Sequence, residues 1–228
     1  MTLDRSALPD VAGLSVGILG GTGDQGRGLA YRFTRAGHSV RIGSRSADRG
    51  AAAAAELAAL PGAGPVSGGD NGYACGADLV IVAVPWAGHG ELVASLAEPL
   101  SGKVVVDCVN PLGFDRHGPY PLKVEEGSAA QQAAALLPRS RVCAAFHHVS
   151  AALLADPEVA RMELDVLVLG DDRDAVAQVQ ALAYRIPGMR GIYAGGLRNA
   201  GQVEAFTANL IAVNKRYKAH AGIRVTDI

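Results

Sequence analysis

Short hydrophobic runs rich in β-branched residues recur along the chain, and stretches with helical character separate them. The runs are apolar at nearly every position, whereas a strand with one face in water would alternate apolar and polar residues. Strands covered on both faces are typical of a parallel sheet with helices on each side. The pattern therefore predicts an α/β fold with a doubly wound, mostly parallel sheet. The predicted strands cover residues 15–19, 39–43, 79–84, 103–109, 141–146 and 165–170.

Two predicted helices have clear start and stop signals. Residues 47–60 are rich in alanine and end at the segment PGAGP, and residues 128–137 begin at a serine and end before Pro138. Residues 110–127 are rich in glycine and proline and form too long a segment for a simple connection. We expect this segment to line a pocket.

The C-terminal part of the chain continues the alternation on a smaller scale. After the strand at 165–170, we expect a helix near 172–184, a short apolar segment at 191–196 and a long helix near 199–218. The chain is therefore expected to divide into a main α/β domain over residues 12–155 and a smaller α/β extension over 156–228 that ends in the long helix.

Composition and charge favour a small-molecule ligand. The chain has 228 residues, of which 49% are hydrophobic and 19% charged, as in a globular protein with a full core. The formal net charge of -1 gives no electrostatic signature for nucleic acid or for an acidic membrane surface. We therefore expect neither as a partner.

Cysteine use and the N-terminus indicate a cytoplasmic protein. The three cysteines, Cys75, Cys108 and Cys143, are widely spaced and form no Cys-x-x-Cys pair, so we expect buried thiols and no metal site. The N-terminus lacks the pattern of a secretory signal. No apolar run approaches the ~20 residues that a membrane-spanning helix needs.

A glycine motif follows the first predicted strand. Gly21, Gly23 and Gly26 have the spacing G-x-G-x-x-G, and a helical stretch comes directly after them. In a Rossmann-type fold this turn brings the backbone close to a dinucleotide pyrophosphate at the start of a helix. A turn that only connects strand and helix is the alternative. Asp24 would repel phosphate unless it points away, so we expect it to cap the helix.

The end of the second predicted strand indicates which dinucleotide is bound. About 20 residues beyond the turn, an acid would select NAD, whereas an arginine accommodates the 2′-phosphate of NADP. Ser44 and Arg45 stand there, and Arg49 follows one helical turn later. We expect the three side chains to bind the 2′-phosphate. The alternative is that the arginines are solvated charges at the start of a helix.

Several further motifs occur in the order found in one family. They are GILGGTGDQGRGLA, VPW at 84–86, FHHVSAA at 146–152, LGDD at 169–172 and the terminal NAGQVEAFTANLIAVNKRYKAHAGIRV. With them the chain resembles the NADPH-dependent reductases of coenzyme F420, also called F420H2:NADP oxidoreductases. The resemblance implies reversible, direct hydride transfer between C4 of the nicotinamide and C5 of the stacked deazaflavin, without a metal or a covalent nucleophile.

The resemblance also assigns site residues. Thr22, Gly23, Asp24 and Gln25 correspond to the phosphate loop, and Ser44, Arg45 and Arg49 to the 2′-phosphate site. Val84 and Asn110 match positions near the adenosine and ribose or on the inner wall. The backbone of Ala151 matches a position that holds the carboxamide. Trp86 follows Pro85 at the end of a buried strand, and we expect it to cover the cleft, although an ordinary core position is the alternative.

The resemblance places two more residues beside the deazaflavin. His147 would stabilise charge on the reduced ring, the alternative being a wall residue with one structural hydrogen bond. Thr207 lies near the same site unless packing alone explains it, and His148 receives no role. Gln202 replaces an arginine of some relatives, which leaves open how the acidic tail of the deazaflavin is held. The candidates for the tail are Arg198, Lys215, Arg216 and Lys218.

Two other functions and the oligomeric state stay open at this point. An NADP-linked imine or carbonyl reductase similar to the pyrroline carboxylate reductases would need a placed proton donor, and no lysine occurs between Arg49 and Lys103. A non-enzymatic NADP-sensing module would need only the nucleotide site. The terminal helix has an apolar stripe that predicts a homodimer, or else covers the chain's own sheet.

Overall fold

The computed structural model describes residues 5–228, and its centre is one eight-stranded sheet. The strand order is β3-β2-β1-β4-β5-β8-β9-β10. All neighbouring strands are parallel except β8 and β9, which pair antiparallel through Cys143 with Gly170 and Ala144 with Leu169. The strands are β1 (Val16–Leu19), β2 (Val40–Ser44), β3 (Val66–Asp70), β4 (Leu79–Val82), β5 (Val104–Asp107), β8 (Arg141–Ala144), β9 (Asp165–Gly170) and β10 (Arg190–Tyr193).

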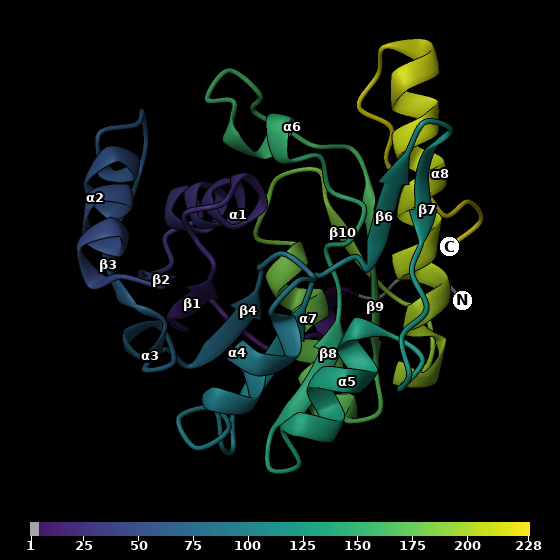
Figure 1. The fold of residues 1–228 in the computed structure, drawn as a ribbon. Coiled ribbons are helices and arrows are strands. Elements are labelled where there is room, and N and C mark those ends of the chain that lie inside the picture. Colours follow the sequence, from purple (N-terminus) through teal and green to yellow (C-terminus); the bar gives the residue numbers. More distant parts are fainter. Residues whose placement is uncertain (1–4) are drawn as a thin grey trace.

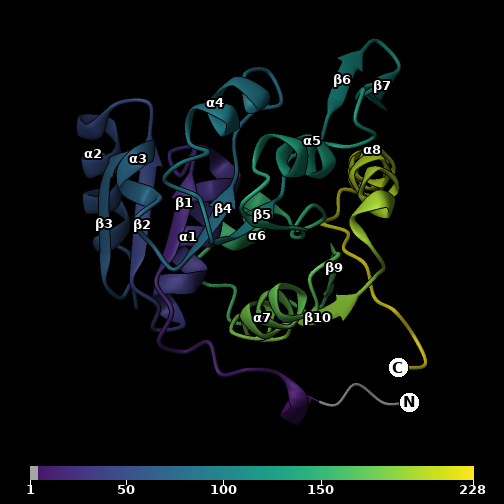
Figure 2. The same cartoon turned by 90° about the horizontal axis from the view of Figure 1, so that it is seen from below.

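Helices cover both faces of this sheet. Figure 2 shows α4 and α5 on one side and α1 and α7 on the other, while Figure 1 shows α2 and α8 at opposite ends of the molecule. The helices are α1 (Asp24–Arg35), α2 (Ala47–Ala58), α3 (Asn71–Ala74), α4 (His89–Ser95), α5 (Ala129–Leu136), α6 (Ala151–Ala155), α7 (Arg173–Ala183) and α8 (Ala200–Tyr217), with 3-10 turns at Arg5–Ala7 and Leu197–Asn199.

The central strand β4 explains why the hydrophobic runs do not alternate. Leu79 and Ile81 pack with α1, α2 and α7, whereas Val80 and Val82 pack with α4 and α5 on the opposite face. All four side chains are at most 1% exposed. Successive residues of a strand point to opposite faces, so both faces must be apolar. The predicted doubly wound, mostly parallel α/β fold is confirmed.

Among the strands, β3 and the hairpin of β6 (Leu112–Asp115) and β7 (Gly118–Pro121) have no counterpart in the prediction, and the short helices α3, α4 and α6 were not predicted either. The edge strand β3 has the sequence VSGGD, which carries little hydrophobic signal, and its glycines allow α2 to approach closely. A Cβ on Gly68 would lie 1.9 Å from the carbonyl oxygen of Gly50. The hairpin lies within the long segment at 110–127 and packs against α8.

The three thiols lie inside the fold as predicted. Cys75, Cys108 and Cys143 are free and buried. Burial raises the pKa of Cys75 to about 11 and that of Cys143 to about 12, and it raises the pKa of Cys108 as well. These thiols therefore stay protonated and pack as small apolar groups.

Between residues 5 and 228, no helix is both long enough and apolar enough to cross a bilayer.

Candidate functional site

The glycine turn joins β1 to α1, and close backbone contacts explain its glycines. Gly20 has a φ of +72°, a left-handed conformation that suits glycine. A Cβ on Gly26 would lie 2.7 Å from the carbonyl oxygen of Gly20, so any larger residue would push α1 away from β1. Gly23 is the N-cap of α1 and has no side chain to occupy the first amides of the helix. The turn therefore fits a bound pyrophosphate.

Asp24 lies at the start of α1, but the prediction that it caps the helix is wrong. Gly23 occupies the N-cap position, with extended backbone angles, and Asp24 is the first helical residue. A side-chain cap requires the residue that precedes the helix, so Asp24 comes one position too late. Its side chain is exposed and lies in the first turn, where the helix dipole favours a carboxylate.

The turn opens onto a cleft of about 630 Å³ at the carboxyl ends of β1, β2 and β4. This is the edge of a parallel sheet where nucleotides bind. The structure brings most of the residues predicted for the nucleotide together there. Those lining the cleft are Thr22, Gly23, Ser44, Arg45, Arg49, Val84 and Pro85. Four further lining residues on α3 and α4 carry no local motif and were not predicted from the sequence, namely Asn71, Glu91, Leu92 and Ser95.

Among the described residues, the two arginines at the cleft have no partner within the protein. Arg45 and Arg49 are exposed, and within residues 5–228 neither guanidinium forms an ion pair or a hydrogen bond with the protein. By contrast, the nearby Arg27 pairs with Glu56 at 2.9 Å. Ser44, the last residue of β2, is 3% exposed and lies beside them in the cleft lining. Free guanidinium groups of this kind suit a phosphate.

A second group of predicted residues meets further along the same edge of the sheet. Asn110 donates a hydrogen bond from Nδ2 to the His147 carbonyl at 3.2 Å, and its Oδ1 accepts one from Thr207 Oγ1 at 3.1 Å. Gln25, in the first turn of α1, donates from Nε2 to the Phe146 carbonyl at 3.3 Å. Four segments far apart in the sequence are thus joined, and α8 supplies Thr207.

His147 is the predicted residue whose surroundings are most unusual. The residue is 5% exposed, and among the described residues neither ring nitrogen has a hydrogen bond of normal geometry, although the backbone of Cys108 and Val109 lies close. Burial lowers the pKa of His147 to about 4, against the opposing effect of Asp107. The ring is therefore neutral near pH 7. The alternative, a wall residue with one structural hydrogen bond, would use the backbone of Cys108 or Val109 as the partner of the ring.

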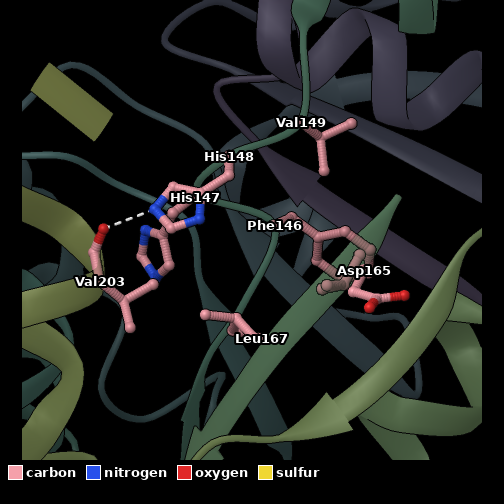
Figure 3. A pocket seen from close by; sticks show the side chains of 8 residues that line it. Phe146, His147, His148, Val149, Asp165, Leu167 and Val203 are labelled. Atoms are coloured by element: carbon pink, nitrogen blue, oxygen red, sulfur yellow. Dashed lines mark hydrogen bonds between the residues drawn. The ribbon is translucent and has the colours of Figure 1, made fainter. Parts of the chain in front are cut away.

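The backbone before His147 is strained, and this turns neighbouring side chains in opposite directions. Phe146 has a φ of 64°, which is uncommon for a bulky residue, and its ring packs against Phe33. Figure 3 shows the Phe146 ring pointing away from the two histidine rings, which lie side by side near Val203. The residues around them leave no space for a water molecule. Backbone strain of this kind is concentrated at functional sites.

His148, which received no predicted role, fixes this loop to α8. Its Nε2 lies 2.6 Å from the Val203 carbonyl, so this nitrogen donates the hydrogen bond (Figure 3). Burial lowers the pKa of His148.

Ala151 begins the short helix α6, and a buried arginine holds the segment that follows. Arg32 is 4% exposed and donates to the carbonyls of Leu154 and Asp156, each at 2.8 Å, and also to those of Leu153 and Val159. Four carbonyl acceptors on one guanidinium fix this segment against α1. The backbone of Ala151 consequently has a defined place at the end of the sheet.

Trp86 does not cover the cleft, and the predicted alternative describes it better. Pro85 and Ala87 line the cleft, whereas the intervening Trp86 is half-buried and packs on the core beneath α4. Its ring stacks on His89 with a centroid distance of 5.4 Å and an interplanar angle of 29°. The backbone that follows β4 turns the tryptophan toward the protein and its neighbours toward the cleft.

The candidates for the acidic tail are exposed at opposite ends of α8. Arg198 lies just before the helix, close to Gln202 in its first turns, whereas Lys215, Arg216 and Lys218 lie at its far end. At 1.5 Å per residue, the two groups are roughly 25–30 Å apart along the helix axis. In the described residues, no three His, Cys, Asp or Glu side chains are grouped so that they could hold a metal ion.

Comparisons with known proteins agree with this geometry. The family model described as "NADP oxidoreductase coenzyme F420-dependent" matches residues 15–111. An F420-dependent NADP reductase from Methanothermobacter thermautotrophicus is 38% identical over 94% of this chain and 96% of its own length. Another, from Methanocaldococcus jannaschii, is 35% identical over 94% of this chain and 99% of its own length.

A solved structure extends the likeness to the fold. It comes from Arthrobacter sp. FB24, is provisionally named an F420-dependent NADP reductase, and is 28% identical to this chain with a TM-score of 0.80. The match covers 94% of this chain and 100% of that one. Since the relatives match over nearly the whole chain and the glycine turn faces the expected cleft, the protein belongs to the family of F420-dependent NADP reductases.

Proposed function

We propose that this protein is an oxidoreductase that transfers a hydride reversibly between C4 of NADPH and C5 of coenzyme F420. One observation carries the proposal. In a chain of this family, the glycine turn, Ser44 and two exposed arginines line one cleft at the carboxyl edge of the sheet. The two coenzymes supply the redox chemistry, and the protein binds and aligns them.

Different residues of the cleft bind different parts of NADPH. Gly21, Gly23 and Gly26 allow the backbone to approach the pyrophosphate, with Thr22 and Gln25 in the same turn. Arg45 and Arg49 bind the 2′-phosphate through charge-assisted hydrogen bonds, and Ser44 donates its hydroxyl. Val84 and Pro85 lie along the adenosine and ribose. The free guanidinium groups support NADPH over NADH.

The joined segments beyond the cleft form the place where the two rings meet. Asn110 and Thr207 contribute the inner wall, and the backbone of Ala151 holds the carboxamide of the nicotinamide. His147 is neutral at pH 7, so it acts on the deazaflavin through a hydrogen bond and carries no charge of its own. An unpartnered ring nitrogen beside this wall supports that role.

The organisation of the chain is part of the same proposal. Residues 12–155 bind NADPH, and residues 156–228 complete the deazaflavin pocket through α8. The protein acts in the cytoplasm as a homodimer. Exposed apolar side chains on α8, namely Phe206, Val213 and Tyr217, support a subunit contact there. Light scattering on the purified protein tests the dimer, and a monomer at micromolar concentration would contradict it.

The activity is tested with purified protein, NADPH and oxidised F420. Loss of the visible absorbance of the deazaflavin, coupled to NADPH oxidation, is the expected result, with NADH as the control that reacts far more slowly. Binding of NADPH without any reaction with F420 would instead support an NADP-sensing module. Oxidation of NADPH by imines or ketones would support the other alternative, for which Thr207 is a poor proton donor because its hydroxyl is bonded to Asn110.

A further inference from the structure

A buried charged pair lies beside the site, and the proposed function does not use it. His89 Nε2 and Asp107 Oδ2 are 2.7 Å apart, and both side chains are 0% exposed. His89 is the first residue of α4 and Asp107 is the last residue of β5. Removing two charges from water is costly, and a well-packed apolar pair in their place is often at least as stable. The pair therefore needs an explanation other than stability.

The hydrogen-bond partners of the two ring nitrogens indicate the protonation state of His89. Gln132 Nε2 faces both carboxylate oxygens of the exposed Glu126, each at 3.3 Å. A carboxylate only accepts hydrogen bonds, so the amide nitrogen of Gln132 must point toward it. The amide oxygen, Oε1, then faces His89 Nδ1 at 3.0 Å. With acceptors at both nitrogens, His89 donates twice and is an imidazolium ion.

The same pair is connected to both halves of the site. On one side, the imidazolium stacks under Trp86 and follows Gly88 directly, and residues 84, 85, 87 and 88 line the nucleotide cleft. On the other side, Asp107 Oδ1 accepts a hydrogen bond from the Val109 amide at 3.0 Å. This bond fixes the turn that presents Asn110 to the His147 carbonyl and to Thr207.

A second buried acid connects this pair to α8. Glu204 is 2% exposed and accepts hydrogen bonds from the Ala129 and Ala130 amides at 2.8 Å and 3.1 Å. These amides start α5, the helix that carries Gln132. Burial raises the pKa of Glu204 to about 7, and the electrostatic effect of Asp107 acts in the same direction. The strand end, α4, α5 and α8 are thus held together around one imidazolium.

We propose that His89 and Asp107 form a positioning pair, which sets the cleft segment at 84–88 and Asn110 relative to each other and so aligns the nicotinamide with the deazaflavin. The pair touches neither coenzyme in this account, and its role rests on the proposed function. Because small displacements of reacting groups slow a transfer steeply, loss of the pair should affect the transfer step more than the binding of NADPH.

The kinetic test compares Asp107→Asn with the wild-type protein. In single-turnover experiments, hydride transfer from NADPH to F420 should slow by about 10- to 100-fold, while the NADPH dissociation constant stays within about threefold. The control is Arg139→Gln, which removes an ion pair of 2.6 Å that is exposed to solvent. This control should transfer hydride at the wild-type rate. A folded Asp107→Asn variant with an unchanged transfer rate would overturn the proposal.

Two further variants keep the test decisive if Asp107→Asn does not fold. The double variant His89→Gln with Asp107→Asn replaces the ions by a neutral hydrogen-bonded pair, and Gln132→Leu removes only the outer hydrogen bond of the imidazolium. We expect a slower transfer in both, by about fivefold in Gln132→Leu. Wild-type transfer rates in these folded variants would also overturn the proposal.

A spectroscopic measurement on the protein without coenzymes tests the pair separately. Nitrogen NMR of the His89 ring should show both nitrogens protonated at pH 7 in the wild-type protein, and a neutral ring would contradict the positioning pair. If the wild-type protein does not react with F420 at all, the proposed function fails. If it reacts and the variants react equally well, only the positioning pair fails.

Discussion

The two halves of the site are built in opposite ways. The nucleotide end is open, and it consists of a glycine turn and exposed arginines that come from one continuous stretch of chain, β1 to the start of α2. The inner end is closed, and it consists of buried histidines and acids that come from α4, β5, α8 and the loop between β8 and α6. The first end is suited to bind NADPH through exposed charges and backbone geometry. The second end is suited to position the two coenzyme rings through buried hydrogen bonds. Mutations should therefore affect affinity at one end and stability or transfer rate at the other.

The largest expected effect is the loss of both cleft arginines. Arg45→Ala with Arg49→Ala should weaken NADPH binding by about 1,000-fold, since each charge-assisted contact contributes about 2 kcal/mol. Binding of NADH, which has no 2′-phosphate, should change little. Isothermal titration calorimetry measures both. The matched control is Arg27→Ala, an arginine that already pairs with Glu56. An unchanged preference for NADPH in the double variant would show that these arginines do not bind the 2′-phosphate.

The next largest effect is a loss of folding stability at low pH, and it is expected from the buried end of the site. The pKa of His147 is lowered to about 4 in the folded state, whereas the unfolded chain has the ordinary value of 6.5. Between these values the unfolded chain binds a proton that the folded chain does not, so stability falls as the pH falls. The loss of folding stability caused by His147 is about 3 kcal/mol, and it is nearly complete near pH 4.

Denaturant unfolding at pH 7 and pH 5 measures this effect. His147→Asn should lose less stability between the two pH values than the wild type does, while His38, whose pKa burial also lowers, keeps its own share. His117→Asn, on the exposed hairpin, is the control. Equal losses in the wild type and in His147→Asn would show that the ring is accessible to protons in the folded protein.

A smaller effect distinguishes the two roles of glycine in the turn. A Cβ on Gly26 would lie 2.7 Å from the Gly20 carbonyl oxygen, so Gly26→Ala should reduce both NADPH binding and the free energy of unfolding, the latter by about 2 kcal/mol. A Cβ on Gly23 has 3.5 Å to the same oxygen, so Gly23→Ala should reduce binding alone. Thermal unfolding and titration together separate the two. Equal stability of the two variants would contradict the close contact at Gly26.

The smallest predicted effect lies at the wall between the two ends. Thr207→Val keeps the shape of the side chain and removes its hydrogen bond to Asn110. The free energy of unfolding should fall by about 1 kcal/mol, and hydride transfer should slow more than NADPH binding weakens. Thr207→Ser, which keeps the hydroxyl, should restore the transfer rate. No rescue by serine would indicate that packing alone explains the threonine.

The contrast between the two ends also explains which site residues could be predicted from the sequence. The glycine turn, Ser44 and the arginines lie within one strand-helix-strand unit, where local spacing fixes their relative positions. The predicted strands of the sheet core are each marked by an apolar run, and the structure confirms them. The edge strand β3 has no such run because its glycines are needed for the close approach of α2.

Long-range contacts account for what the sequence could not predict. Glu91 and Ser95 line the cleft only because α4 folds over the end of β4. His89 and Asp107 are 18 positions apart, and no periodic pattern connects a helix start with the end of the next strand. The direction of the Trp86 ring likewise depends on His89 beneath it. Such pairs become visible only when the topology is known.

The proposed direct hydride transfer is best tested by following the transferred hydrogen itself. NADPH with deuterium at both C4 positions is incubated with the protein and oxidised F420, and the reduced deazaflavin is analysed by mass spectrometry and NMR. Direct transfer predicts one deuterium at C5 of the deazaflavin and none exchanged with water. Reduced F420 without the label, or no reduction of F420 while NADPH is bound, would contradict direct hydride transfer between the two coenzymes.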